Sequence, residues 1–293
     1  MIMQGLPQAV AVAAGFAILS LLFPPVGILS SAVIGLVALK VSLRQAIYVT
    51  IITSAALGVV VIGMGQPGLL GVLSGLVQWL PVALLSALLA RSASWSLVMQ
   101  SVFAFGIIVT ALLYLLFPDL DQFWLKMMKQ LLQPALEEAG GNAGSVTASL
   151  EAVAPLVTGV LVSGLLVTSL LGLMLARSMQ ASLENPGGFA REFQELRIGT
   201  WAAGLSVLFL ALATAVSVPW LNALATVAMA VFLIQGFAVV HGVVARLGWP
   251  KGTVIGLYVL LLVFLTPVVL VVAGLGIVDA FADFRRRLGS PAQ

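Results

Sequence analysis

The stretch PWLNALATVAMAVFLIQGFAVVHGVV, residues 219–244, contains no Asp, Glu, Lys or Arg over 26 consecutive positions. A transmembrane helix needs about 20 apolar residues to cross a hydrocarbon core of about 30 Å. The run is rich in Leu, Val, Ala and Gly, which is the composition of packed transmembrane helices and not of membrane-barrel strands. The stretch therefore predicts a membrane-spanning α-helix.

The same pattern recurs along the chain, which is 61% hydrophobic and only 8% charged. An ordinary soluble domain has about 25% charged residues, so this composition leaves too little polar surface for a water-soluble globule. We therefore predict an all-α fold, a polytopic bundle of transmembrane helices that forms one integral membrane domain over residues 1–293. The charge-free blocks are 8–39, 46–63, 69–90, 94–117, 152–176, 198–217, 219–244 and 253–278.

The first and last blocks are too long for one straight span, and both contain proline. Pro24-Pro25 interrupts residues 8–39, and Pro267 lies near the middle of the last block once it is extended to Ala282. Proline lacks a backbone donor and clashes with the preceding turn, so a helix breaks or kinks there. Each end block is either a kinked helix or a hairpin of two short helices, which gives eight to ten membrane helices.

The basic residues favour hairpins at both ends, because cytoplasmic loops carry an excess of Lys and Arg. In that arrangement both termini are cytoplasmic, and only Lys126 and Lys129 of the 13 basic residues lie on the outer side. With single kinked spans the split becomes 8 to 5. We therefore predict a multi-pass protein of the bacterial inner (plasma) membrane. The N-terminal sequence MIMQGLPQ has no basic residue before its apolar run, which predicts a retained membrane segment and not a cleaved signal peptide.

The predicted outer loop, residues 118–148, contains an amphipathic helix. Its apolar side chains recur at helical spacing with polar residues between them, which is typical of a helix on a membrane surface. Such a helix is either a lid on the bundle or a gate over a substrate pocket. The glycine-rich residues 139–144 predict a flexible turn after it. The apolar positions are Leu120, Phe123, Trp124, Met127, Met128 and Leu131.

The predicted inner loop, residues 178–197, contains the turn sequence Asn-Pro-Gly-Gly at 185–188. Phe189 and Phe193 then share one face of a short amphipathic helix, and charges of both signs occupy the other face. Two interpretations stay open for this helix: a solvated or interfacial surface, or a docking surface for a cytoplasmic partner.

Aspartyl intramembrane proteases and carboxylate-coupled pumps need carboxylates at membrane depth, and the charge-free blocks contain none, which argues against both classes. The chain has no cysteine and one histidine, which excludes His/Cys metal sites. Gly71-Val-Leu-Ser74-Gly75 loosely resembles a nucleophile turn with His241 as its base, but such a pattern arises by chance among 29 glycines. We predict that the protein is not an enzyme, has no cofactor and binds no nucleic acid.

A few uncharged polar and aromatic side chains lie at membrane depth. A glutamine in hydrocarbon must find hydrogen-bond partners, which either another helix or a ligand supplies. The candidate substrate-binding residues on this ground are Gln78, Trp79, Gln235 and Tyr258.

The C-terminal sequence DAFADFRRR, residues 279–287, predicts one continuous helix leaving the inner leaflet. On such a helix Asp283 lies four residues from both Asp279 and Arg287, so the three share a face. Arg285, Arg286 and Arg287 then lie near anionic head groups, where they either set the topology or bind lipid or a partner.

Three small residues on the first helix, Ala9, Ala13 and Ala17, recur every four positions and form a smooth ridge. Such a ridge suits close helix contact, either within the protein or with a partner helix.

With this ridge, the inner-loop sequence NPGGFAREFQELRIG (185–199) and the terminus GIVDAFADFRRR (276–287), the chain resembles the YybS-like family of predicted bacterial membrane proteins over essentially its whole length. That family is distantly similar to the substrate-binding subunits of energy-coupling-factor vitamin transporters. The similarity implies that Ala9, Ala13 and Ala17 contact a membrane coupling subunit. This chain is longer than those subunits and lacks a counterpart of their vitamin-binding residues, so the resemblance implies no substrate.

We therefore expect a membrane transport component: a permease or substrate-binding subunit for a small uncharged or amphipathic solute or a lipid-like molecule, powered by partner subunits. Its partners are membrane lipids and a coupling subunit or cytoplasmic protein. The alternative is a membrane scaffold or regulator that docks a cytoplasmic partner through residues 185–197 and the terminal arginines. A cavity near the four candidate residues favours transport, and a void-free bundle favours the scaffold.

Overall fold

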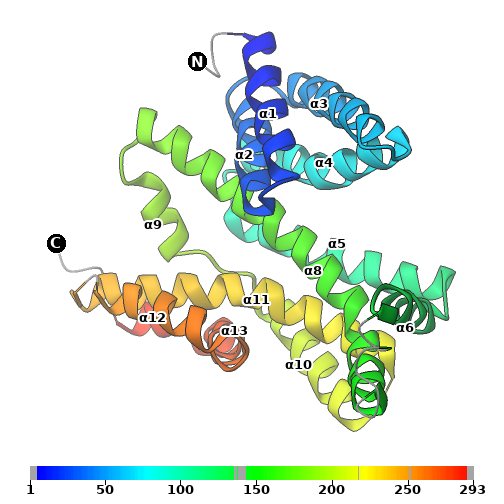
Figure 1. The fold of residues 1–293 in the computed structure, drawn as a ribbon. Helices are drawn as coiled ribbons and strands as arrows, with labels where there is room; N and C mark the ends of the chain where they lie inside the picture. The colour runs from blue at the N-terminus through cyan, green and yellow to red at the C-terminus, as the bar shows by residue number, and fades with distance from the viewer. Residues whose placement is uncertain (1–4, 135–136, 138–142, 217, 251, 289–293) are drawn as a thin grey trace. The chain divides into compact units, whose positions relative to one another are not determined.

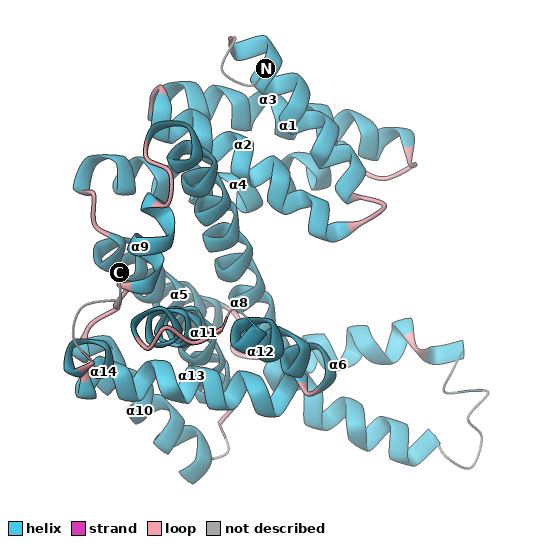
Figure 2. Cartoon of the chain, turned by 90° about the vertical axis from the view of Figure 1, so that its left-hand side faces the viewer, coloured by secondary structure: helices cyan, strands magenta, loops and turns pink. Residues whose placement is uncertain are grey.

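The computed structural model describes residues 5–134, 137, 143–216, 218–250 and 252–288. Over these residues the chain forms helices and loops and no strand, which confirms the all-α prediction (Figure 2). Lys251, one of the basic residues predicted to be cytoplasmic, and residues 138–142 of the predicted outer loop lie outside the described residues.

Within the described part of the chain, six helices are long and apolar enough to cross a membrane. They are α3 (Leu43–Gly63), α4 (Gly68–Ser92), α5 (Trp95–Leu116), α8 (Ala143–Glu184), α11 (Pro219–Arg246) and α13 (Leu265–Ala282). The shorter apolar helices are α1 (Leu6–Ser20), α2 (Gly27–Lys40), α10 (Thr200–Ala215) and α12 (Gly252–Val263). The protein is therefore a multi-pass membrane protein.

The first apolar block is a hairpin. The short 3-10 turn η2 (Pro24–Val26) separates α1 from α2, as the two adjacent prolines predict. The Ser30 hydroxyl donates to the Ala13 carbonyl across the hairpin at 2.9 Å. The two helices therefore pack side by side and do not form one kinked span (Figure 1).

The last apolar block breaks at Phe264, between α12 and α13, and not at Pro267 itself. Phe264 has φ −123° and ψ 58°, and Pro267 is the third residue of α13. The proline ring clashes with the carbonyl four residues earlier, which belongs to Val263 at the end of α12. Pro267 is thus tolerated in the first turn of a new helix, and the break lies just before that turn.

Helix α8 extends well beyond the predicted block 152–176. Its 42 residues correspond to about 63 Å at the α-helical rise. Charged residues at its two ends are paired: Glu151 with Lys129 at 3.1 Å and Glu184 with Lys40 at 2.6 Å. Residues 143–148 of the predicted outer loop and 178–184 of the predicted inner loop are therefore helical.

Each of the two predicted loops also contains a short helix. The outer loop contains α6 (Leu120–Leu131), and the inner loop contains α9 (Gly188–Gln194). The predicted amphipathic helix in the outer loop is thus confirmed.

The chain divides into two compact units, where the sequence predicted one membrane domain. Unit 1 contains residues 1–98 and 165–194, and unit 2 contains residues 99–164 and 195–293. Helices α5 and α8 contribute residues to both.

The core of unit 1 lies among α1 to α4. Ala9, Ala13 and Ala17 are buried there, packed in one apolar cluster with α2 and α3. The alanine ridge is therefore occupied within the chain, and the expected contact of these residues with a partner helix is wrong for this structure. Internal packing accounts for the pattern, because small side chains let neighbouring helices approach closely.

The core of unit 2 lies where α11 packs against α13. A methyl group on Gly236 would lie 1.9 Å from the Val272 carbonyl oxygen, and one on Gly276 would lie 2.3 Å from that of Phe232. The two helices are in backbone contact at these glycines.

Candidate functional site

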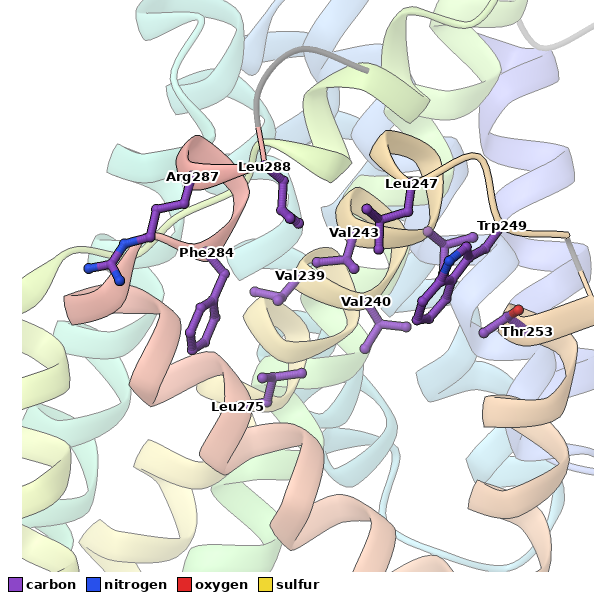
Figure 3. Close-up of a pocket in the computed structure, with 11 residues that line it drawn as sticks. Val239, Val240, Val243, Leu247, Trp249, Thr253, Leu275, Phe284, Arg287 and Leu288 are labelled. Carbon is purple, nitrogen blue, oxygen red and sulfur yellow. The ribbon is translucent and has the colours of Figure 1, made fainter. Parts of the chain in front are cut away.

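Unit 2 contains an apolar pocket of about 510 Å³ at the end of α11. Its walls come from α11, the following turn, α12, α13 and the short terminal helix α14 (Phe284–Arg287). Figure 3 shows the valines of α11 on one side and Phe284 and Leu288 on the other. The lining residues are Val239, Val240, Val243, Val244, Leu247, Trp249, Thr253, Leu275, Phe284, Arg287 and Leu288.

One wall depends on the turn after α11. Gly248 has φ +64°, a conformation that glycine adopts without strain and that commonly follows a helix C-terminus. The Trp249 amide then donates to the Val244 carbonyl at 3.0 Å. This turn brings the Trp249 ring back beside Val240 (Figure 3).

The opposite wall depends on a buried ion pair at the end of α13. The chain turns at Asp283, which has φ +50°, and α14 folds back. The Arg285 guanidinium donates from Nη2 to Asp279 Oδ2 at 2.7 Å, with side-chain exposures of 4% and 0%. The Phe284 amide donates to the other oxygen of the same carboxylate at 3.1 Å. Asp279 thereby holds α14 against the pocket.

A polar network around this pair joins several elements of unit 2. Gln235 Nε2 donates to the Gly276 carbonyl at 2.9 Å and to Asp279 Oδ2 at 3.5 Å. Gln235 Oε1 accepts from the Ile198 amide at 2.7 Å. Burial lowers the pKa of the Arg285 guanidinium, and the charge of Asp279 opposes that effect. Arginine nevertheless stays protonated in proteins, so the pair is ionic.

The predicted continuous helix over residues 279–287 is wrong. Because the chain turns at Asp283, Arg285 points into the protein and not toward head groups. Asp283 pairs with Arg197 at 2.6 Å, and not with Arg287. Arg286 and Arg287 remain exposed, as expected for residues near a membrane surface.

The four predicted substrate-binding residues do not line this pocket. In unit 1, Gln78 Nε2 donates to Thr168 Oγ1 at 3.2 Å, and Trp79 is buried. In unit 2, Gln235 is buried in the network above, and Tyr258 stacks on Phe237 with ring centres 5.6 Å apart. Interhelical hydrogen bonds, the alternative interpretation, account for both glutamines.

The inner-loop helix α9 is anchored inside unit 1. Glu192 pairs with Arg177 and accepts from Trp95 Nε1 at 2.9 Å. Burial would raise the pKa of Glu192, but the hydrogen bonds from Arg177 and Trp95 outweigh it and keep this pKa below the usual value. The Phe189 ring lies 6.1 Å from that of Trp95 and 6.0 Å from that of Phe193. The predicted docking face is thus partly used by internal contacts.

The outer-loop helix α6 packs on the N-terminal half of α8. Trp124 Nε1 donates to Thr158 Oγ1 at 2.9 Å, and Lys129 pairs with Glu151. Phe123, Met127 and Leu131 lie on the exposed side. This exposed apolar stripe is typical of a helix at a membrane interface.

Ser74 and His241, the pair from the loose nucleophile pattern, each bond to a nearby carbonyl of their own helix. Ser74 Oγ donates to the Gly71 carbonyl at 3.0 Å, and His241 Nδ1 lies 2.8 Å from the Phe237 carbonyl oxygen. These contacts fit the packing interpretation of both residues.

The buried pair was not predicted, because Asp279 directly follows the charge-free block 253–278 and was placed with the arginines on a helix that leaves the membrane. The signal was an acidic residue one position after an apolar run, with arginines six to eight positions later. The pocket itself had no sequence signal, because its walls come from separate parts of the chain.

A family model described as "Predicted membrane protein (DUF2232)" matches residues 11–280, which include the pocket walls from α11, α12 and α13. No curated protein and no solved structure matches the chain.

Proposed function

The chain belongs to the DUF2232 family of predicted membrane proteins, and we propose that it is a membrane transport component that binds an amphipathic or lipid-like molecule in the pocket of unit 2. The observation that carries this proposal is the apolar pocket between α11 and α14. Its volume of about 510 Å³ lies within the range of about 300–1,000 Å³ that is typical of small-molecule sites.

The chemistry of the walls supports an apolar ligand portion. Valine, leucine and phenylalanine side chains form most of the lining. Small-molecule sites are typically lined by apolar side chains with a few polar groups that orient the ligand. The few polar groups of the lining are Trp249 in the turn, Thr253 in α12 and Arg287 in α14. They suit the polar end of an amphipathic molecule.

The proposal places energy coupling outside this chain. The resemblance to YybS-like proteins, and through them to substrate-binding subunits of energy-coupling-factor transporters, motivates a partner subunit as the energy source. Because the alanine ridge is buried, such a partner would contact another surface. The proposal keeps the protein in the bacterial inner membrane with both termini cytoplasmic, which rests on the distribution of basic residues. It assigns no catalytic step to the chain.

The scaffold alternative requires a free docking surface on α9 and the terminal arginines. On α9, Phe189 packs on Trp95 and Glu192 pairs with Arg177. Among the terminal arginines, Arg285 is buried in its pair with Asp279. These three side chains therefore already have partners within the chain. A ligand-sized apolar pocket supports the transport function over this alternative, although none of the four candidate residues lines it.

Filling the pocket tests the proposal. Val243→Trp places a large ring among the lining side chains, so we expect the amount of amphiphile retained by the purified protein to fall at least fivefold. The measurement is native mass spectrometry of the protein released from nanodiscs, with retained molecules counted per chain. Val259→Trp is the matched control, because Val259 is exposed on α12 and does not line the pocket. Equal retention by both variants and the unsubstituted protein would mean that the pocket is not the binding site.

A further inference from the structure

The charge around the mouth of this pocket points to the head group of its ligand. Resting on the proposed function, we propose that the pocket takes an anionic phospholipid from the surrounding bilayer, whose acyl chain enters the apolar walls and whose phosphate binds Arg286 and Arg287. Unit 2 contains five arginines, of which Arg246 donates from Nη1 to the Gly242 carbonyl of its own helix at 3.2 Å.

Two of these arginines are already neutralised by carboxylates. Arg285 pairs with Asp279 at 2.7 Å, and Arg197 pairs with Asp283 at 2.6 Å. Both carboxylates lie at the end of α13, so this end carries no further acidic side chain that could neutralise the arginines of α14.

Arg286 and Arg287 carry the remaining positive charge of α14. The Arg286 side chain is 87% exposed, and its Nε lies 4.0 Å from an Asp283 oxygen that Arg197 already contacts. Among the residues that the structure describes, Arg287 forms no ion pair. An anion beside α14 is therefore attracted by the charges of both guanidinium groups.

Arg287 joins the charged and apolar parts of the site. It lines the pocket, yet Figure 3 shows its guanidinium pointing away from the apolar side chains. Long basic side chains commonly lie this way at membrane interfaces, with the stem on apolar surface and the charge outside. Trp249, half exposed on the other wall, is of the residue type enriched at the level of the head groups. The pocket thus has an apolar interior and a cationic mouth with interfacial character.

The buried pair positions this mouth. Asp279 accepts from both the Arg285 side chain and the Phe284 amide, so it fixes the first turn of α14 and thereby the place of Arg287. Guanidinium groups bind phosphate oxygens with two parallel hydrogen bonds, which the phosphate of a lipid head group beside Arg287 can accept. A zwitterionic head group adds a cation beside the same arginines and loses part of that attraction.

A lipid competition experiment tests this inference. The intact protein is placed in nanodiscs that contain equal amounts of phosphatidylglycerol and phosphatidylcholine with identical acyl chains, and the lipids retained after release are identified by native mass spectrometry. We expect the unsubstituted protein to retain phosphatidylglycerol preferentially. Each arginine near the membrane surface contributes about a fivefold preference, so Arg286→Gln/Arg287→Gln lowers the preference by about 25-fold. Arg191→Gln, on the exposed side of α9 in unit 1, is the matched control and leaves the preference unchanged.

The outcomes separate this inference from the proposed function. Equal retention of both lipids by the unsubstituted protein, with retention still lost in Val243→Trp, overturns the assignment of an anionic head group and leaves the pocket as the binding site. A phosphatidylglycerol preference that survives the double substitution overturns the role of Arg286 and Arg287. If the unsubstituted protein retains no lipid at all, the proposed function fails with the inference.

Discussion

Replacement of Asp279 by leucine is expected to lower the free energy of unfolding by about 3–5 kcal/mol, the usual effect of removing one partner of a buried ion pair. The variant leaves the Arg285 guanidinium buried without its carboxylate, and it also removes the acceptor of the Phe284 amide. Gln235 loses one of its contacts as well. The measurement is the unfolding midpoint in detergent, followed by circular dichroism during heating and denaturant titration.

Two control variants separate the ion pair from general damage. Asp279→Leu/Arg285→Leu removes both charges, and it should recover most of the loss because a buried pair can often be replaced by apolar side chains at little cost. Glu151→Gln removes one partner of the pair with Lys129, which is more exposed, and should cost less than about 1 kcal/mol. A double variant as unstable as Asp279→Leu would show that the charges are not the cause.

The second large effect is expected at the contact between α11 and α13. In Gly236→Ala the new methyl group would lie 1.9 Å from the Val272 carbonyl oxygen, so the two backbones must move apart. Overpacking of this kind costs about 1–3 kcal/mol or more, and we expect a loss near the upper end because backbone atoms cannot rotate away. Gly276→Ala, with a contact of 2.3 Å to the Phe232 carbonyl oxygen, should behave in the same way.

The chain offers a matched control on the same helix. Gly274 lies two residues from Gly276 in α13, and a methyl group there meets nothing within 4 Å. Gly274→Ala should therefore be neutral or stabilise the protein by up to about 1 kcal/mol through helix propensity. Equal destabilisation by Gly274→Ala and Gly276→Ala, measured as the unfolding midpoint, would contradict the packing account.

The features that could be predicted are those that depend only on residues close together in the sequence. Charge-free runs predict apolar helices because hydrophobicity over about 20 residues decides whether a segment can cross the hydrocarbon core. Pro24-Pro25 predicts a break because the effect of proline on a helix is local. The length of helix α8 was underestimated because Glu151 and Arg177 end its charge-free block, whereas Glu151 and Glu184 pair with Lys129 and Lys40 of other helices.

The candidate site depends on contacts that no local pattern contains. The turn at Asp283 puts a non-glycine residue at φ +50°, which a composition argument does not anticipate. Only this turn lets Arg285 reach back to Asp279 and bring α14 over the pocket. Gln235, by contrast, was selected because it is polar at depth, and its partners are the Ile198 amide and the Gly276 carbonyl. A polar residue in a membrane helix thus indicates a need for hydrogen bonds without showing whether a ligand or the protein meets it.

Photolabelling with a lipid that carries a diazirine in its acyl chain tests the central claim most directly. The account predicts saturable labelling of pocket residues such as Val240, Val243 and Leu275, located by mass spectrometry and lost in Val243→Trp. Labelling of Leu262, which is exposed on α12, should instead rise in proportion to lipid concentration. If the pocket residues are unlabelled, or are labelled in the same non-saturable way as Leu262, the pocket does not bind a lipid-like molecule.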